Sequence, residues 1–252
     1  MIIAIFLLIA TSIGILRRLA ELQSRRRCRR CLLVTAHPDD ESLFFANYVD
    51  AAVRAGAAVH VLCLSTGNAN GLGPLREMEL RSACSALKIP DSHITILDDP
   101  ALQDGFHPWE AAPVVARLTA TLASVQPDEL VTFDAGGVSG HPNHTSIFRA
   151  VKGMLEAQGA EPAPDVGVRH CRVLTLVTHS LLYKFSGPMG AALTPLLGLR
   201  AGDEVAIAPG PLAGVRAMCR HRSQLVWYRW LFMAFSTYTY VNQLRPLGVM
   251  RY

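Results

Sequence analysis

Leu32-Leu33-Val34-Thr35-Ala36-His37-Pro38-Asp39-Asp40-Glu41 is an apolar run that ends in a histidine, a proline and three carboxylates. Residues 31–36 are predicted to form a buried strand, because this run is short, apolar and contains β-branched side chains. Pro38 would end the strand in a tight turn, and apolar residues at helical spacing predict a helix over 42–55. The acidic cluster is therefore expected at the carboxyl end of a strand, where open α/β sheets bind their ligands.

Two interpretations of these acids are open. Asp39 or Asp40 could cap the following helix, since acids stabilise helix N-termini. Capping needs only one acid, however, and does not need the histidine. Alternatively, His37 and Asp40, which are three residues apart across the turn, face one divalent metal ion, and Asp39 is left free to act as a base. Glu41 is expected to be an N-terminal residue of the helix.

Strands and helices are predicted to alternate along the chain that follows. Strands are expected at 57–65, 93–97, 129–133 and 172–178, and helices at 75–87, 110–124 and 145–158. A proline-rich connector is expected at 161–167. This alternation predicts an α/β fold, with a Rossmann-like, mainly parallel sheet and helices on both faces.

A second motif, Phe-Asp-Ala-Gly-Gly-Val-Ser-Gly-His-Pro-Asn-His at 133–144, also follows a predicted strand. Its glycines let the backbone approach a ligand closely. Two loop histidines alone are more often surface residues than ligands. Together with His37 and Asp40, His141 and His144 predict a metal site in which two of the three histidines and the carboxylate bind the ion, with coordination positions open for water or substrate. Zinc suits such ligands best, although iron, manganese or cobalt can occupy them.

Composition indicates one sizeable α/β domain, since the chain has 252 residues and is 50% hydrophobic. Its six cysteines include one C-x-x-C, formed by Cys28 and Cys31. We expect no zinc or redox role for this pair, because no second cysteine pair completes a site. The absence of a disulfide-like pattern favours a reducing compartment.

The N-terminal segment predicts a membrane anchor. Residues 1–16 are apolar and uncharged, and Leu19 and Ala20 bring the run close to the roughly 20 residues that span a bilayer. The charge excess of the chain, +4 in total, is concentrated just after it, in Arg17, Arg18, Arg25, Arg26, Arg27, Arg29 and Arg30.

A cleaved signal peptide would carry its positive charge before the apolar run, whereas this cluster follows it and should stay in the cytosol. We expect an anchor at 1–20, a basic cytosolic linker at 21–30 and a cytosolic domain at 31–252. The arginines would meet anionic membrane rather than nucleic acid, because they directly follow the anchor.

The C-terminal region has a different composition. Residues 186–214 are rich in glycine and proline, and residues 225–235 read Leu-Val-Trp-Tyr-Arg-Trp-Leu-Phe-Met-Ala-Phe. This aromatic segment is either a helix packed on the sheet or a surface that dips into the membrane interface, where Trp, Tyr and Arg are favoured.

The motifs AHPDDE and GHPNH resemble those of the PIG-L family, also called LmbE-like deacetylases. The longer TFDAGGVSGHPNH and the segment at 219–224 are similar to the eukaryotic branch, and the resemblance extends from residue 31 to the C-terminus. It implies metal-dependent removal of the acetyl group from the glycolipid N-acetylglucosaminyl-phosphatidylinositol. That reaction belongs to the synthesis of glycosylphosphatidylinositol anchors at the endoplasmic reticulum membrane.

The resemblance also implies a role for each matching residue. The metal ligands match His37, Asp40 and His144. The general base matches Asp39, and the histidine that stabilises the oxyanion or protonates the leaving amine matches His141. Bacterial relatives usually have aspartate where this chain has Asn143, so we expect His141 to be oriented differently here. They also often have tyrosine where it has Ser139, so no tyrosine oxyanion donor is expected.

Substrate contacts are less apparent from the sequence. Arg76 begins a predicted helix and could meet a sugar hydroxyl or the inositol phosphate, or it could be an exposed surface arginine. His221 and Arg222 are candidates for the lipid phosphate. Two other functions remain open: deacetylation of a different N-acetylglucosamine conjugate, and non-catalytic glycolipid binding at a relic site.

Overall fold

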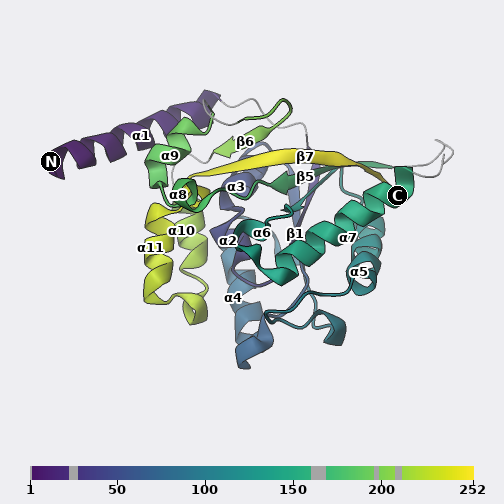
Figure 1. Ribbon diagram of the computed structural model, residues 1–252. Helices are drawn as coiled ribbons and strands as arrows, with labels where there is room; N and C mark the ends of the chain where they lie inside the picture. Colours follow the sequence, from purple (N-terminus) through teal and green to yellow (C-terminus); the bar gives the residue numbers. More distant parts are fainter. Residues whose placement is uncertain (1, 23–27, 160–168, 196–198, 208–211) are drawn as a thin grey trace.

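The computed structural model describes residues 2–22, 28–159, 169–195, 199–207 and 212–252. Its strands are β1 (Arg30–Thr35), β2 (Ala58–Cys63), β3 (Ile94–Ile96), β4 (Glu129–Phe133), β5 (His170–Leu176), β6 (Glu204–Ile207) and β7 (Val241–Arg251). They form one sheet in the order β3-β2-β1-β4-β5-β7-β6 (Figure 1). The first five strands run parallel, whereas β7 is antiparallel to its neighbours β5 and β6. The predicted mainly parallel sheet is confirmed.

Helices join and cover these strands. They are α1 (Ile2–Leu22), α2 (Asp40–Leu43), α3 (Ala46–Arg54), α4 (Gly73–Ala86), α5 (Ala111–Val125), α6 (Gly137–Gly140), α7 (Pro142–Gly159), α8 (Leu181–Lys184), α9 (Gly187–Leu193), α10 (Leu212–Met218) and α11 (Trp227–Phe235). The single helix expected at 42–55 is divided into α2 and α3. The chain leaves helical geometry at Phe45, whose side chain is fully buried.

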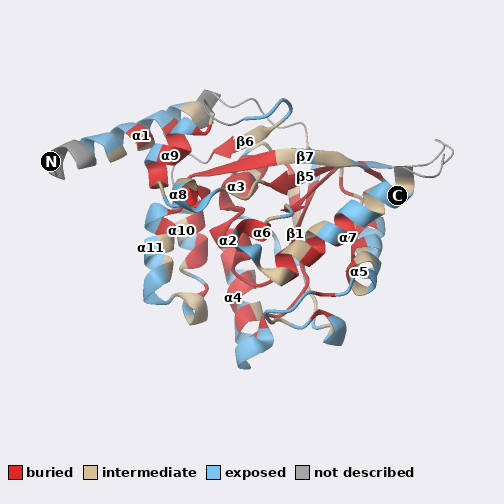
Figure 2. Ribbon diagram, in the orientation of Figure 1, coloured by how far each residue is buried: buried red, intermediate tan, exposed pale blue. Residues whose placement is uncertain are grey.

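The sheet order changes direction between β1 and β4. From β1 the chain crosses through α3 to β2 on one side, and from β4 it crosses through α7 to β5 on the other side. Because such crossovers are right-handed, α3 and α7 cover opposite faces. Both central strands are buried almost throughout (Figure 2). Their carboxyl ends meet at this topological switch point, so both sequence motifs emerge at the same edge of the sheet.

The last two strands were not predicted. β7 contains Arg245, Pro246 and Gly248, which obscure a strand pattern. Its buried Asn242 is satisfied by distant backbone, because it accepts from the Tyr48 N–H at 2.9 Å and donates to the Phe44 carbonyl at 2.7 Å. The connector predicted at 161–167 lies outside the described residues.

The N-terminal helix packs partly on the domain. Leu16 is buried against Ala191, Ile207 and Val241, whereas Leu7 and Leu8 are exposed. Within the described part of the chain, no helix combines the length and the apolar character needed to cross a bilayer. The spanning helix expected at 1–20 is therefore not supported.

The start of the domain differs from expectation in one further respect. Cys28 and Cys31 are joined by a disulfide, and the other four cysteines are free. The sequence shows no disulfide-like pattern, so the expectation that the chain lacks disulfides is wrong for this pair. The disulfide lies at the beginning of β1, at the opposite end of the strand from His37. Part of the linker expected at 21–30 lies outside the described residues.

Candidate active site

The two motifs meet in one cluster at the switch point. Side-chain nitrogens of His37, His141 and His144 lie within 4.8 Å of one another. Asp40 joins them, with its Oδ1 3.3 Å from His144 Nε2 and its Oδ2 3.9 Å from His37 Nδ1. The structure thus brings together the three ligands implied by the family resemblance, and His141 stands beside them.

Asp40 is a buried and ionised carboxylate. Its Oδ2 accepts hydrogen bonds from the backbone N–H groups of Ala36 at 3.0 Å and His37 at 2.9 Å. Burial alone would raise the pKa of Asp40. The His144 and His37 side chains and the hydrogen bond from the His37 backbone N–H outweigh burial and hold the pKa below its ordinary value. The turn therefore fixes Asp40 with Oδ1 turned toward His144.

Each ligand histidine is oriented through its outer nitrogen. His37 Nε2 lies 3.0 Å from Asn143 Oδ1 and 3.1 Å from Asp104 Oδ1. His144 Nδ1 lies 3.0 Å from the Gly137 carbonyl oxygen. His144 Nε2 is buried, and among the described residues the group that it faces is Asp40 Oδ1, at 3.3 Å. Metal-bound histidines are held in this way, so these residues fit a divalent ion.

A strained loop places His144. Gly137 and Val138 have φ values of +53° and +64°, which is a rare conformation for a β-branched residue and typical of functional sites. A Cβ on Gly137 would lie 3.0 Å from that of His144, so glycine permits the close approach. On its other side, the His144 ring stacks on Phe133 with a centroid distance of 3.9 Å.

Asp39 lies in the same pocket but faces arginines instead of histidines. Its φ is +121°, which turns its side chain away from that of Asp40. Its Oδ2 is 3.1 Å from an Arg229 nitrogen, and its Oδ1 is 3.7 Å from an Arg76 nitrogen. Burial raises the pKa of Asp39 above its ordinary value, although both arginines oppose this. A raised pKa suits a general base.

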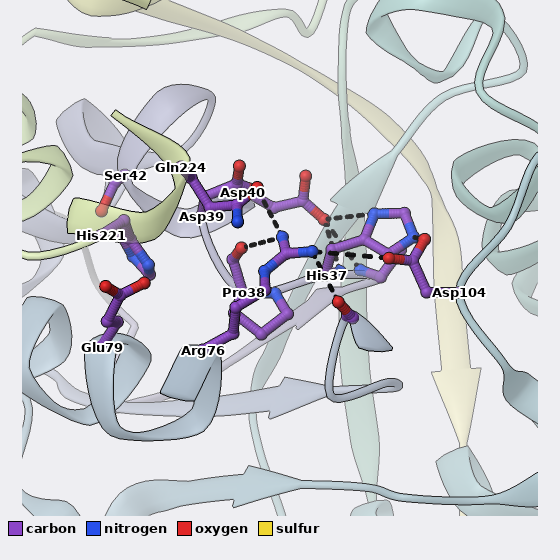
Figure 3. Close-up of polar contacts among 12 residues, drawn as sticks. His37, Pro38, Asp39, Asp40, Ser42, Arg76, Glu79, Asp104, His221 and Gln224 are labelled. Atoms are coloured by element: carbon purple, nitrogen blue, oxygen red, sulfur yellow. Dashed lines mark hydrogen bonds and ion pairs between the residues drawn. The ribbon is translucent and has the colours of Figure 1, made fainter. Parts of the chain in front are cut away.

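Arg76 is buried, so the alternative of an exposed surface arginine is wrong. Its guanidinium donates to the carbonyl oxygens of Pro38 at 2.6 Å and Gly67 at 2.8 Å, and it lies 3.4 Å from Asp104 Oδ2 (Figure 3). Asp104, which also contacts His37, was not predicted as a site residue. The sequence gives no signal to distinguish it from the other aspartates of its loop.

The close approach of Gly67 to Arg76 gives a matched test. A Cβ on Gly67 would lie 2.5 Å from the guanidinium, whereas one on Gly71 would have nothing within 4 Å. Both glycines have positive φ, so either alanine variant should lose about 1 kcal/mol of unfolding free energy. We expect only Gly67→Ala to displace Arg76 and lower kcat/KM, by about tenfold or more, in steady-state kinetics. Equal activity of the two variants would contradict a role for Arg76.

His221 does not reach the pocket. It is fully buried, with Nε2 2.7 Å from Glu41 Oε1, and Figure 3 shows it between Ser42 and Glu79. Glu41 in turn accepts from the Asp39 N–H at 3.1 Å. Burial lowers the pKa of His221, but Glu41, with Asp39 and Glu79, outweighs burial, so the pKa is raised. His221 is therefore placed to hold Glu41, and through it the Asp39 backbone, from outside the pocket. Arg222, the next residue, is exposed.

These two neighbours should differ in stability measurements. His221→Ala leaves the Glu41 carboxylate buried without its cationic partner, which typically costs about 3–5 kcal/mol of unfolding free energy. Arg222→Ala removes an exposed side chain and should change it by less than about 0.5 kcal/mol. Urea unfolding of both variants measures the difference. Similar stabilities would show that the Glu41 pair does not support the motif.

The pocket has a volume of about 230 Å³ and is lined by His37, Asp39, Asp40, Leu43, Phe44, Arg76, Asp104, Ser139, His141, His144, Gln224 and Arg229. The side chain of Asn143 contacts His37, and its backbone N–H donates to His141 Nδ1 at 3.3 Å. Burial and the other histidines lower the pKa of His141 to about 4. His141 is thus neutral, with its proton on Nε2.

This fold and this cluster define an LmbE-like deacetylase architecture. The solved structure of N,N'-diacetylchitobiose deacetylase from Pyrococcus horikoshii has the same fold, with a TM-score of 0.59 and 16% identity over 92% of this chain and 90% of that one. The sequence model of the PIG-L family, described as GlcNAc-PI de-N-acetylase, matches residues 32–155.

Two relatives extend the match over most of the chain. The N-acetylglucosaminyl-phosphatidylinositol de-N-acetylase of Bos taurus is 38% identical over 227 residues, which cover 86% of this chain and 83% of the relative. A probable enzyme of the same name from Schizosaccharomyces pombe is 33% identical over 94% of this chain and 96% of its own length. The chain belongs to the PIG-L family of de-N-acetylases.

Proposed function

We propose that this chain hydrolyses the N-acetyl group of N-acetylglucosaminyl-phosphatidylinositol, giving glucosaminyl-phosphatidylinositol and acetate, in the synthesis of glycosylphosphatidylinositol anchors. The main support is that Asp39 shares one pocket with His37, Asp40 and His144. The 38% identity to the enzyme of that name from Bos taurus supports the substrate.

His37, Asp40 and His144 would hold a divalent ion, and zinc suits two nitrogen ligands and one oxygen ligand best. The buried Nε2 of His144, which faces the Asp40 carboxylate, supports this ligand set. When bound, such an ion supplies Lewis acidity, which polarises an amide oxygen and makes water more acidic.

The chain's own residues carry the proton transfers. Asp39 accepts a proton from the attacking water and passes it to the departing amine, so that amide and water become amine and acetate. Arg229 and Arg76 hold the Asp39 carboxylate in place. His141, neutral and protonated on Nε2, donates a hydrogen bond to the oxygen that becomes negative during attack.

The reaction takes place at the endoplasmic reticulum membrane, with residues 31–252 on its cytosolic side. The apolar residues 1–20 attach the chain to the membrane, and the basic residues that follow favour the cytosolic orientation. Arg76 is the proposed contact for the sugar or the inositol phosphate. Arg222 is exposed and does not line the pocket, so any contact with the lipid phosphate would be made outside the pocket.

Two competing functions are separated by one comparison. The purified chain is assayed for acetate release from N-acetylglucosaminyl-phosphatidylinositol and from a soluble N-acetylglucosamine conjugate, alongside metal analysis. We expect release from the glycolipid, with about one divalent ion per chain. Release from the soluble conjugate alone would indicate another deacetylase, and glycolipid binding without release would indicate a binding protein.

A further inference from the structure

Large apolar and aromatic side chains are exposed together on α8 and α11. We call the set formed by Leu181, Leu182, Phe185, Trp227, Trp230 and Leu231 the α11 face. Leu182 and Trp227 are 90% and 74% exposed, and Figure 2 shows much of α11 as exposed. Phe185 contacts Phe232 with ring centroids 6.1 Å apart, which joins α8 to α11. An apolar surface of this kind marks a binding site.

The charge around this face selects one kind of partner. Residues 205–252 contain six arginines and no aspartate or glutamate; two of the six, Arg229 and Arg245, pair with Asp39 and Asp203. α8 and α9 also contain no acid. Arg216, Arg220 and Arg222, just before α11, are exposed. Tryptophan beside arginine, without carboxylates, suits the headgroup region of an anionic bilayer.

The helix that carries most of this face also borders the pocket, because Arg229 is one of the lining residues. On the inner side of α11, Arg229 contacts Asp39 Oδ2 at 3.1 Å, whereas Trp227 and Trp230 point outward and are exposed. One helix, about 10 Å thick, therefore separates the α11 face from the proposed base. α9 contacts α1 as well as α8 and α11, so the helix that carries the exposed Leu7 and Leu8 adjoins this region (Figure 1).

We propose that the α11 face docks on the surface of an anionic phospholipid bilayer, with Trp227 and Trp230 among the headgroups and the pocket facing the lipid-bound substrate. This rests on the proposed function for its substrate. It extends membrane contact from the N-terminal segment to the catalytic domain itself, so that two separate surfaces of the chain meet the bilayer.

Tryptophan fluorescence tests the docking without any activity measurement. The full chain is mixed with vesicles of phosphatidylcholine and phosphatidylserine in a 4:1 ratio, in which the phosphatidylcholine carries brominated acyl chains that quench nearby tryptophan. Trp109, the third tryptophan, is buried. We expect quenching of more than half of the emission, and its loss in the double variant Trp227→Phe and Trp230→Phe. Attachment through α1 alone would leave wild-type emission unquenched and overturn the proposal.

Activity provides the second measurement. The double variant Trp227→Ala and Trp230→Ala should release acetate from vesicle-borne glycolipid at least tenfold more slowly, yet act normally on the same headgroup without acyl chains. Met78→Ala, which removes an exposed apolar side chain on α4, is the matched control and should change the rate on neither substrate. Equal loss on both substrates, or a tryptophan-dependent dimer in light scattering, would overturn docking. If wild type releases no acetate from either substrate, the proposed function fails, and quenching still decides the docking.

Discussion

Asp39→Asn is expected to lower the rate of acetate release by about 100- to 10,000-fold, which is the range of general-base contributions, without loss of bound metal. Asparagine keeps the shape of the side chain and cannot accept the proton. Asp39 contacts two arginines and does not face the histidine cluster, so metal binding should be unaffected. Single-turnover kinetics and metal analysis of the same preparation measure both quantities.

The matched comparison is Asp40→Asn, which removes the charge from the carboxylate that faces His144. That variant should lose both metal and activity. If Asp39→Asn also loses its metal, the two aspartates do not have separate functions and the base has been misassigned.

His144→Ala is expected to abolish metal binding under conditions in which wild type is fully loaded. Changing a residue that only orients a ligand typically weakens metal affinity 10- to 100-fold, so removing a ligand should weaken it by more than about 100-fold. Titration with zinc, followed by competition with a chelator, measures the affinity.

Asn143→Ala provides a graded control for this experiment. Asn143 contacts His37 through its side chain, so its loss should weaken binding within the 10- to 100-fold range. If His144→Ala keeps wild-type affinity and His141→Ala loses it, His141 is the third ligand in place of His144.

Much of the parallel sheet could be predicted because its strands are short apolar runs bounded by turn residues. The run before His37 and the strand at 129–133 were placed almost as the structure has them. β6 and β7 were missed because their stability comes from partners far away in sequence. The buried Asn242 is satisfied by α3 and the turn before it, and no local pattern indicates this.

The site was predictable where two motifs carry the chemistry and unpredictable where single residues join them. Arg229 contacts an aspartate 190 positions earlier, and it lies in a segment that shows only aromatic and apolar character. Glu41 was taken for a helix-terminal residue because its partner His221 is 180 positions away. Contacts of this range depend on the packing of the whole domain.

The pairing of β1 with β4 makes the proposed ion a cross-link. His37 and His144 follow these two neighbouring strands and come from segments about a hundred residues apart. Any opening that separates the strands must also release the ion, so bound metal adds to the free energy of unfolding. At a thousand times its dissociation constant, it adds about 4 kcal/mol. The cluster that performs the reaction would thus also stabilise the contact between the two halves of the sheet.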